Sequence, residues 1–509
     1  MAAMFVSAAD LGDATLDCDI AIFGAGAAGI SLADSLRTGR QRIVLVEGGT
    51  FDIESGAQAL FSARSIGEPF SPNHGRYRVF GGAAVAWTGR CAMLDPQDLE
   101  PRPWLRDSDP PISFADLADP YRLAAQACGF ETGWGADPAV LARVHALPDR
   151  PAAIAPFAWR FWGTARNCYQ HWGERHYAPF RRSETLRVLL GTNLVGFETE
   201  PGGRRVNAAT LRTIDGKQFT LGARQFVLCC GGIENARILL NVAEQTPALV
   251  DDVAPVLGRY FMQHPRATTA SVTAAGAQAI KLQKLFNRFK RNRGLQFETG
   301  FSLSALTQAR EGLVNASAIL RYRRAPERWS AMIASRLRVD RMAEAAIRWR
   351  LGRVQILEPV IASLVVDLEQ QPDRDSRIVL DGQRDGLGLR KAAIDWRIGP
   401  VERQTSTTLT RAVCRWIEHL GLGTANVAED IESDGALRDD RLMESFHHLG
   451  TTRMSETPRT GVVDADLRVH GTDNLYVCGA SSMPVGGHAN PTLTIVALAM
   501  RLGDHLKAL

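Results

Sequence analysis

The alternation of hydrophobic and polar positions near the start of the chain predicts a strand, a helix and a second strand in close succession. Residues 19–23 form an apolar run typical of a buried parallel strand, residues 30–37 have helical spacing, and residues 42–46 form a second short apolar run. A βαβ unit of this kind is the core of dinucleotide-binding folds. The first part of the chain is therefore expected to contain such a unit.

Farther along, short apolar runs between turn residues predict more strands, and longer periodic stretches predict helices. The last of them, a strand at 475–478 and a helix at 493–502, would return the chain to the domain begun near its start. Residues 266–440 are predicted to form a second, sheet-containing domain, with a loop at 429–441. The remaining strands are expected at 187–190, 206–214, 218–221, 225–230, 314–321, 363–370 and 391–398, and the remaining helices at 114–127 and 234–242.

Three glycines separate the first strand from the first helix, in the sequence Gly24-Ala25-Gly26-Ala27-Ala28-Gly29. Gly24 permits a tight turn, Gly26 lets a pyrophosphate approach the backbone, and Gly29 lets helix and strand pack closely. The free N–H groups and the positive dipole end of the helix favour a phosphate. This spacing favours a dinucleotide site over a glycine-rich turn in another α/β fold.

The second strand ends in an acidic residue, which narrows the choice of dinucleotide. Glu47 can hold the ribose hydroxyls, and its charge would repel the additional phosphate of NADP. The Gly48-Gly49 pair that follows is more similar to FAD-binding flavoproteins than to NAD dehydrogenases. FAD is therefore the expected cofactor.

Composition excludes several classes of function. A formal net charge of +4 over 509 residues is small, so no nucleic-acid partner is expected. The 8 cysteines are scattered without metal-ligand spacing, which predicts reduced thiols and no metal site. Residues 1–17 lack the basic and apolar regions of a signal peptide, and no apolar run is long enough to cross a bilayer. A cytoplasmic location is expected.

Two stretches allow more than one interpretation. The aromatic stretch 156–177 could line a pocket for a polyhydroxylated ligand or supply ordinary core aromatics. The arginine-rich stretch 321–353 has apolar residues roughly on one helical face, as does a helix that meets a membrane surface, an electron acceptor or a partner subunit. A surface helix packed on its own domain is the favoured interpretation of the second stretch.

Two short C-terminal segments carry the candidate chemistry. Residues 446–452 place two histidines beside a glycine and two threonines, and residues 486–494 place a histidine and an asparagine just before the final apolar helix. A base and hydrogen-bond donors near the start of a helix are what alcohol oxidation at a flavin requires.

Together, six motifs make the chain resemble the glucose-methanol-choline (GMC) family of FAD-dependent alcohol oxidoreductases over nearly its whole length. Within that family it looks most similar to pyranose oxidases and to bacterial glycoside 3-oxidases and 3-dehydrogenases. The motifs are GAGAAG (24–29) with Glu47, FGGAAVAW (80–87), CGGIENAR (230–237), GRYFMQHP (258–265), HHLGTTRM (447–454) and GHANPTLT (487–494).

The resemblance implies the catalytic residues. The family's catalytic histidine begins an H-x-x-G-T pattern, which places it at His447, with His448 as the competing candidate. The family's second catalytic position corresponds to Asn490, and His488 is expected to shape the edge of the flavin. The cofactor-binding residues expected from the motifs are Gly24, Gly26, Ala27, Ala28, Gly29, Glu47, Gly48, Gly81, Gly82, Trp87, Cys230, Gly231, Gly479, Ala480, His488, Asn490, Pro491 and Thr492.

The resemblance also implies the fold. It is α/β, with a Rossmann-like FAD-binding domain and a substrate domain that has a mainly antiparallel sheet covered by helices. The FAD-binding domain is expected to comprise residues 16–63, 183–262 and 441–509. The substrate-binding domain, with loops that cover the flavin, is expected to comprise residues 64–182 and 263–440.

The expected reaction is oxidation of a secondary alcohol of a sugar or glycoside to the keto-sugar at C2 or C3, by hydride transfer to flavin N5. A non-sugar alcohol is the alternative substrate, and a flavin-binding scaffold without turnover is disfavoured by the presence of both His447 and Asn490. Ala86 stands where pyranose oxidases often carry the histidine that bonds to the flavin, so non-covalent FAD is expected. Oxygen or another electron acceptor is an expected partner, and a homo-oligomer is possible.

Overall fold

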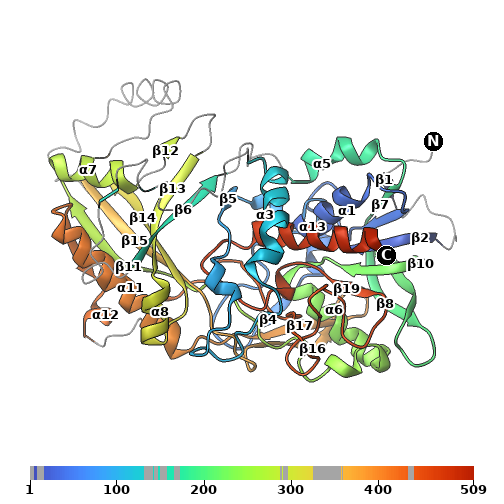
Figure 1. Ribbon diagram of the computed structural model, residues 1–509. Coiled ribbons are helices and arrows are strands. Elements are labelled where there is room, and N and C mark those ends of the chain that lie inside the picture. The colour runs from blue at the N-terminus through green and yellow to red at the C-terminus, as the bar shows by residue number, and fades with distance from the viewer. Residues whose placement is uncertain are drawn as a thin grey trace.

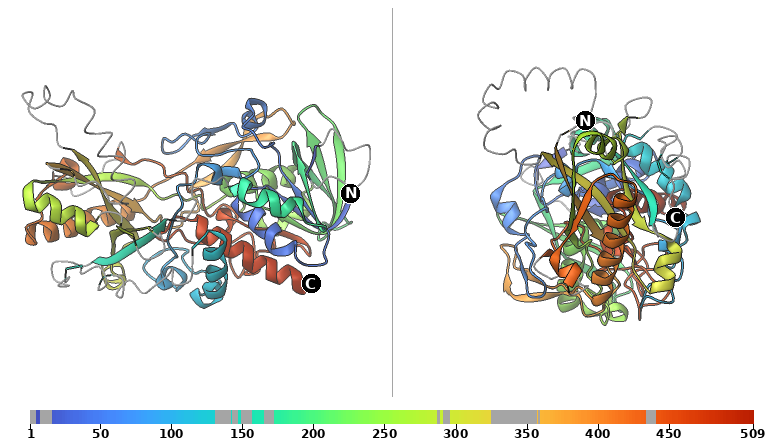
Figure 2. Two further views of the ribbon diagram at one scale, coloured as in Figure 1. Left: turned by 90° about the horizontal axis from the view of Figure 1, so that it is seen from above. Right: turned by 90° about the vertical axis from the view of Figure 1, so that its left-hand side faces the viewer.

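A computed structural model of the chain describes residues 5–7, 16–130, 142, 147–148, 157–164, 172–286, 289–290, 296–324, 357, 359–433 and 441–509. These residues form an elongated molecule (Figures 1 and 2). A mostly parallel sheet and its helices lie at one end, and an antiparallel sheet lies at the other. The expected α/β fold is confirmed.

The largely parallel sheet is built around β2 (Leu16–Phe23), the first strand predicted from the sequence. β3 (Ile43–Val46) pairs with one side of β2 and β10 (Gln218–Leu228) with the other, both in parallel. β10 is one continuous strand where two strands were predicted, so that prediction was wrong at 222–224. The strand order is β1 (Phe5–Ser7), β7 (Leu186–Leu190), β3, β2, β10, β9 (Val206–Thr213) and β8 (Thr192–Thr199), and β19 (Leu475–Val477) also pairs with β10.

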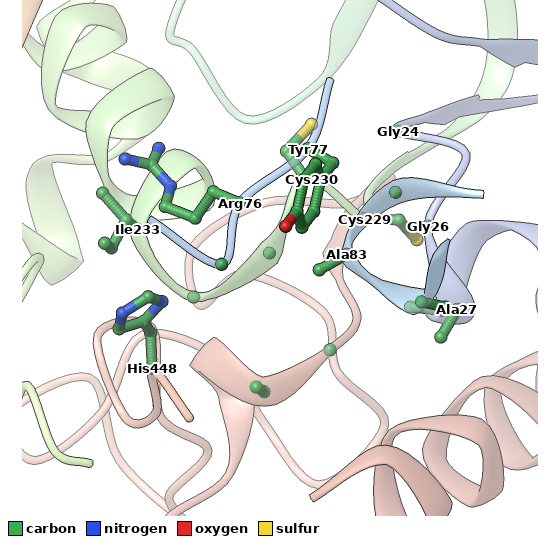
Figure 3. A pocket seen from close by; sticks show the side chains of 18 of the residues that line it. Gly24, Gly26, Ala27, Arg76, Tyr77, Ala83, Cys229, Cys230, Ile233 and His448 are labelled. Atoms are coloured by element: carbon green, nitrogen blue, oxygen red, sulfur yellow. The ribbon is translucent and has the colours of Figure 1, made fainter. Parts of the chain in front are cut away.

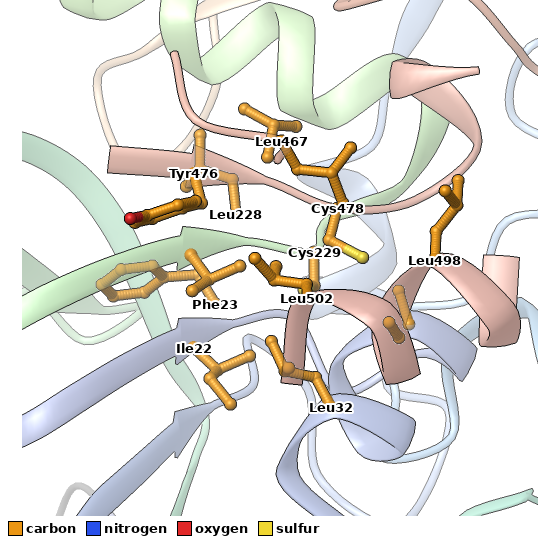
Figure 4. Close-up of a cluster of buried hydrophobic side chains, with 14 of the residues drawn as sticks. Ile22, Phe23, Leu32, Leu228, Cys229, Leu467, Tyr476, Cys478, Leu498 and Leu502 are labelled. Atoms are coloured by element: carbon orange, nitrogen blue, oxygen red, sulfur yellow. The ribbon is translucent and has the colours of Figure 1, made fainter. Parts of the chain in front are cut away.

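Helices from both ends of the chain cover this sheet. α13 (Thr492–Ala508) packs against α1 (Ala27–Leu36) and α3 (Phe114–Ala127), so the end of the chain completes the βαβ unit begun near its start. Figure 4 shows Leu498 and Leu502 of α13 beside side chains of α1 and the sheet. The other helices near this sheet are α5 (Trp172–Arg181), α6 (Gly231–Gln245) and the short α2 (Ser55–Ala59).

The second sheet is antiparallel throughout its described pairs, and α11 (Pro400–His419) covers one of its faces. On β15 (Val360–Leu368), Leu364 and Val366 are buried in the core shared with α11. Asp367, between buried neighbours, points to the other face because strand side chains alternate. The order is β18 (Thr424–Val427), β11 (Arg266–Ala274), β15, β14 (Ala316–Arg324), β13 (Gln296–Leu303), β6 (Phe157–Thr164) and β5 (Arg90–Cys91), with β12 (Phe289–Lys290) on β13.

A third, small sheet packs against α6. It consists of β16 (Arg377–Arg384), β17 (Arg390–Asp395) and β4 (Ala63–Ser65), and its core includes Ile378, Ile394 and Trp396. Residues 377–395, expected in the substrate domain, therefore contact a helix of the expected FAD-binding domain. The remaining helices are α7 (Gly276–Phe286), α8 (Ala305–Glu311) and α12 (Glu429–Ser433).

Two further expectations can be compared with this arrangement. The loop predicted at 429–441 is wrong at its start, where α12 forms. The basic stretch 321–353 continues β14 to Arg324 and beyond that lies outside the described residues. Among the described helices, none has both the length and the apolar character needed to cross a bilayer.

Candidate active site

A cavity of about 530 Å³ extends from the parallel sheet to the antiparallel sheet. Its lining includes residues after the carboxyl ends of β2, β10 and β19, and residues of β11 and β14. In open α/β sheets, ligands bind at the carboxyl ends of the strands, because the loops and helix starts gather there. One end of the cavity therefore has the position of a dinucleotide site, and the antiparallel sheet forms the other end.

Glycines leave the backbone open at three neighbouring strand ends. A Cβ at Gly26 would meet nothing closer than Gly82 Cα at 3.9 Å, one at Gly479 nothing closer than Ala28 Cβ at 3.9 Å, and one at Gly231 nothing within 4 Å. All three line the cavity. Figure 3 shows Gly26 and Ala27 beside the junction at Cys229 and Cys230. This open backbone fits an elongated ligand such as FAD lying across the strand ends.

Gly24 and Gly29 are glycines because of packing within the protein. A Cβ at Gly24 would lie 2.7 Å from Cys229 O, and one at Gly29 would lie 1.9 Å from Gly24 O. Gly24 also has a φ of +98°, a left-handed conformation that disfavours other residues. These two positions close the turn and bring α1 against the sheet, while Gly26 leaves the space above the turn free.

Glu47 lies at the end of β3 and holds the glycine loop. Its carboxylate accepts hydrogen bonds from the N–H groups of Ala25 at 2.8 Å and Gly49 at 2.9 Å. Burial raises its pKa, and the hydrogen bonds from backbone N–H groups oppose that rise. Each oxygen retains an acceptor lone pair on the cavity side, so the residue can still receive ribose hydroxyls.

Most of the expected cofactor-binding residues line the cavity, and Trp87 adds a buried indole Nε1 without a hydrogen-bond partner among the described residues. Three of the expected residues lie behind the lining: Gly29, Gly81 and His488. Gly81 donates its N–H to Ala25 O at 2.8 Å, so it supports the glycine loop from below. The expected residues in the lining are Gly24, Gly26, Ala27, Ala28, Glu47, Gly48, Gly82, Trp87, Cys230, Gly231, Gly479, Ala480, Asn490, Pro491 and Thr492.

His447 and Asn490 lie together in the cavity lining, joined to a third residue, His264. His447 Nδ1 lies 2.9 Å from His264 Nδ1, and His447 Nε2 lies 3.4 Å from Asn490 Nδ2. His264 Nε2 lies 3.0 Å from Gly487 O and 3.3 Å from Gly486 O. The two glycines precede Asn490 in the same loop.

These contacts determine which ring nitrogen of His447 carries the proton. Carbonyl oxygens only accept, so His264 Nε2 must donate to them, which leaves Nδ1 of a neutral His264 as an acceptor. His447 Nδ1 therefore donates to His264, and His447 Nε2 keeps its lone pair. That lone pair faces Asn490 Nδ2, an amide donor, in the cavity lining.

The electrostatics keep both rings neutral. Burial lowers the pKa of His447 well below its usual value, and the positive charge of Arg266 lowers it further. Burial also lowers the pKa of His264, against the opposing effect of Asp367 and the two carbonyl acceptors. At neutral pH, His447 is consequently a free base with Nε2 available.

His448 lines the cavity but has a different environment. Its ring stacks on Phe261 at 5.9 Å between centroids, and its Nε2 has no hydrogen-bond partner in the described part of the chain. Burial lowers its pKa to about 3. Without a partner that fixes a tautomer or an amide beside it, His448 lacks the arrangement found at His447.

His488 lies against Asp95, away from the cavity lining. Its Nδ1 is 3.5 Å from Asp95 Oδ2, and burial lowers its pKa to about 4. His488, Asp95 and Asp98 each offer a possible metal ligand, all within 4.8 Å of one another. Arg160 and Asn315 already direct donors at these carboxylates, so protein groups compensate the charge that would attract a cation.

A buried ion pair supports the loop that holds His264. Arg102 donates two hydrogen bonds of 2.7 Å to Glu369, one to each oxygen. Glu369 Oε1 also accepts the N–H of Gly487 at 3.0 Å, and this is the glycine whose carbonyl accepts from His264. Gly487 has a φ of +59°, and a Cβ there would lie 2.5 Å from Leu94. The ion pair therefore fixes the peptide on which the His264 tautomer depends.

Sequence reasoning did not identify His264 or the arginines of the antiparallel sheet as site residues. His264 lies in the motif 258–265 that contributed to the resemblance, and its imidazole next to a proline was the available signal. Arg90, Arg266 and Arg321 line the cavity from three strands far apart in sequence, so no local motif connects them. Among the described aromatics of the stretch 156–177, none lines the cavity, which agrees with the core interpretation.

Comparison with known proteins gives a consistent result. Residues 372–499 match the family model described as GMC oxidoreductase. The chain is 24% identical to the fructose dehydrogenase large subunit of Gluconobacter japonicus over 64% of this chain and 54% of that subunit. It is 29% identical to the C-glycoside 3-oxidase of Arthrobacter globiformis over 28% of this chain and 27% of that enzyme. The chain thus spans about half or less of each of these relatives.

A solved structure shares the fold over nearly the full length. The crystal structure of pyridoxine 4-oxidase from Mesorbium loti superposes with a TM-score of 0.58 at 17% identity, covering 96% of this chain and 99% of that one. At this identity the similarity shows the fold alone.

The glycine geometry yields a prediction that separates folding from cofactor binding. Gly26→Ala has room for its Cβ and a φ of −85° suited to alanine, so it should fold normally and bind FAD at least about 10-fold more weakly. Gly29→Ala should lower the thermal unfolding temperature of the flavin-free protein itself, because its Cβ meets Gly24 O at 1.9 Å. Calorimetry of flavin-free protein and FAD titration measure the two effects. Equal destabilisation by both variants would contradict the assignment.

Proposed function

We propose that this chain is an FAD-dependent GMC oxidoreductase that oxidises a secondary alcohol of a sugar or glycoside to a keto-sugar, at C2 or C3. The observation that carries the proposal is the pairing of His447 Nε2 with Asn490 Nδ2 in a cavity that also contains the open strand ends. A base and an amide donor are thereby placed where one hydroxyl can contact both.

In this proposal His447 accepts the proton of the substrate hydroxyl at Nε2. The ring is already in the tautomer that has a lone pair there, so no proton rearrangement precedes the step. His264 stabilises the imidazolium that forms by accepting a stronger hydrogen bond from His447 Nδ1. Proton removal by a positioned histidine typically contributes about 10²- to 10⁴-fold to rate.

Asn490 has a complementary role at the same oxygen. Its Nδ2 donates to the hydroxyl oxygen as the proton leaves, which orients the carbinol and stabilises developing negative charge. The start of α13 at Thr492 directs its free N–H groups and positive dipole end toward the cavity. Bound FAD would supply the hydride acceptor, held by the open strand ends and Glu47. Oxygen or another acceptor would then take up the electrons.

Two relatives support a carbohydrate substrate. The fructose dehydrogenase subunit and the C-glycoside 3-oxidase are named for sugar and glycoside oxidation, and the second for position 3. The competing proposal, a non-sugar alcohol oxidised by the same residues, is supported by the fold shared with pyridoxine 4-oxidase. Both proposals use His447 and Asn490 in the same way. The division into an FAD-binding domain (16–63, 183–262 and 441–509) and a substrate-binding domain (64–182 and 263–440) also remains a proposal.

The substrate class can be tested by anaerobic mixing of the FAD-loaded protein with sugars, glycosides and simple alcohols. We expect the oxidised-flavin absorbance to disappear with a sugar or glycoside, followed by a keto-sugar product identified by mass spectrometry and NMR. Bleaching only by non-sugar alcohols would replace the substrate class. Admission of air after bleaching distinguishes an oxidase, which recovers its colour within seconds, from a dehydrogenase.

The assignment of the base can be tested with one substitution at two neighbouring positions. His447→Phe should slow flavin reduction by about 100-fold or more, because it removes the base while filling the same space. His448→Phe should retain most of the rate, since it preserves the stack on Phe261 and removes no observed hydrogen bond. Stopped-flow absorbance gives both rates, and FAD content provides the control. A slower His448 variant with a normal His447 variant would reverse the assignment.

The mode of FAD attachment has its own test. Ala86 lies in the cavity lining next to Trp87 and has no nucleophilic atom, so the flavin is expected to be non-covalent. Acid precipitation of the holoenzyme should release all of the yellow colour into the supernatant. Flavin that stays in the protein pellet after washing would show a covalent bond to another residue.

A further inference from the structure

The cavity has a second group of charged side chains, on the face of the antiparallel sheet opposite α11. Arg266 on β11 pairs directly across from Asp367 on β15, and cross-strand partners share a face. Arg321 on β14 pairs across from Ser363, which lies four residues before Asp367 on β15, so Arg321 lies on the same face. Glu298 on β13 accepts a hydrogen bond from Arg321 on that face. Arg90 joins them from β5.

The five side chains contact one another in a defined pattern. Arg266 donates to both oxygens of Asp367, at 2.5 and 3.1 Å, and Arg321 Nη1 donates to Glu298 Oε1 at 2.9 Å. Arg90 lies between the two carboxylates, with Nε 3.1 Å from Glu298 Oε2 and Nη1 4.0 Å from Asp367 Oδ2. Arg266 therefore pairs with Asp367 and Arg321 with Glu298, while Arg90 lies within 4.0 Å of both carboxylates.

Arg90 is the unusual member of this group. Its side chain is 8% exposed, and its guanidinium lies over the Trp162 ring at 4.2 Å from the centroid. Nε and Nη2 have no hydrogen bond of acceptable geometry within the described part of the chain. Burial lowers its pKa to about 10, so it stays charged at neutral pH. A buried guanidinium with unused donors is unfavourable unless another acceptor approaches it.

The charges do not cancel. Among the described residues, this group has three guanidinium groups facing two carboxylates, which leaves one positive charge on the group. The adjacent network does not supply the missing negative charge. There Arg160 pairs with Asp95, Arg102 pairs with Glu369, and burial raises the pKa of Asp98; none of these residues lines the cavity.

The excess charge is close to the reacting centre. Arg90, Arg266 and Arg321 line the same cavity as His447 and Asn490. Arg266 is two residues from His264, whose Nδ1 contacts His447. Ser445 and Phe446, which precede His447 in the chain, also line the cavity. A substrate whose hydroxyl contacts His447 would therefore extend toward the arginines.

We propose that the substrate carries a carboxylate, bound by Arg90 together with Arg266 and Arg321, so that the enzyme acts on an acidic sugar or its glycoside. This inference rests on the proposed function, which it makes more specific. A carboxylate matches the single surplus charge and the planar donor pairs of guanidinium groups. An aminosugar, which is cationic, would be repelled by the same group.

The first test measures binding, independently of turnover. Isothermal titration of the FAD-loaded protein compares a methyl glucuronide, its neutral methyl ester, the methyl glucoside and a methyl glucosaminide. We expect the glucuronide to bind at least about 10-fold more tightly than the ester and the glucoside, since each hydrogen bond to a charged group is strong. The glucosaminide should bind most weakly. Equal affinity for all four ligands would overturn the proposal.

A phosphorylated sugar tests whether the site prefers a carboxylate to a phosphate. Glucose 6-phosphate presents a dianion of tetrahedral shape on the same sugar scaffold. The proposed site should bind it more weakly than the glucuronide, because the second negative charge of the dianion would lose its hydration without gaining a partner. Tighter binding of the phosphate would replace the carboxylate assignment.

Substitutions of the arginines test whether these residues cause the preference for the glucuronide. Arg321→Gln, at a half-exposed position, should weaken glucuronide binding by about 10-fold and leave glucoside binding unchanged, and Arg321→Lys should recover part of the loss. Arg310→Gln removes the same charge from exposed α8, outside the cavity lining, and should change neither. Arg90→Gln should have the largest effect. If that variant fails to fold, the Arg321 pair still decides the outcome.

The two proposals can fail separately. If the glucuronide binds as expected in titration but no ligand bleaches the flavin, the carboxylate site stands and the proposed oxidation fails. If the neutral glucoside bleaches the flavin and the glucuronide binds no better, the oxidation stands and the carboxylate site fails.

Discussion

The arrangement of the candidate active site depends on one hydrogen bond outside the His447–Asn490 pair, from His264 Nε2 to the carbonyl of Gly487. Because a carbonyl cannot donate, this bond determines the tautomer of His264, then that of His447, and so places a lone pair at the atom facing Asn490. The Arg102–Glu369 ion pair holds the Gly487 peptide in turn. A buried ion pair is weak evidence for stability. Here its structural effect is to orient one peptide.

The end of the cavity next to the parallel sheet depends on a different constraint, which is that glycines leave the backbone uncovered at three strand ends. Gly26, Gly231 and Gly479 follow β2, β10 and β19, three adjacent strands drawn from the beginning, middle and end of the chain. The parallel pairing of β10 with both other strands brings these glycines into one row. An elongated ligand would therefore contact open backbone at all three strand ends only when the three chain segments have assembled.

Local patterns sufficed for part of this structure and failed where distant segments meet. The βαβ unit, α3 at 114–127 and the pairing of His447 with Asn490 follow from spacing, glycine chemistry and family motifs. His264 was missed because its role depends on carbonyls more than 200 positions away. His488, two residues from Asn490, was expected to shape the edge of the flavin, but its ring lies against Asp95, next to the left-handed Gly487. Because Gly487 adopts a left-handed conformation, side chains do not alternate regularly along this loop, so sequence spacing alone could not predict which of them faces the cavity.

The arginines of the antiparallel sheet and the histidine base act on each other through charge. Burial lowers the pKa of His447, and the charges of Arg266 and Arg90 lower it further, which keeps its Nε2 unprotonated but also weakens it as a base. A carboxylate bound between these arginines would cancel part of their field and raise the proton affinity of His447 only when the ligand is present. Binding energy at one end of the cavity would then increase base strength at the other. A neutral ligand would occupy the same space without this gain, so the coupling would favour acidic substrates in the chemical step as well as in binding.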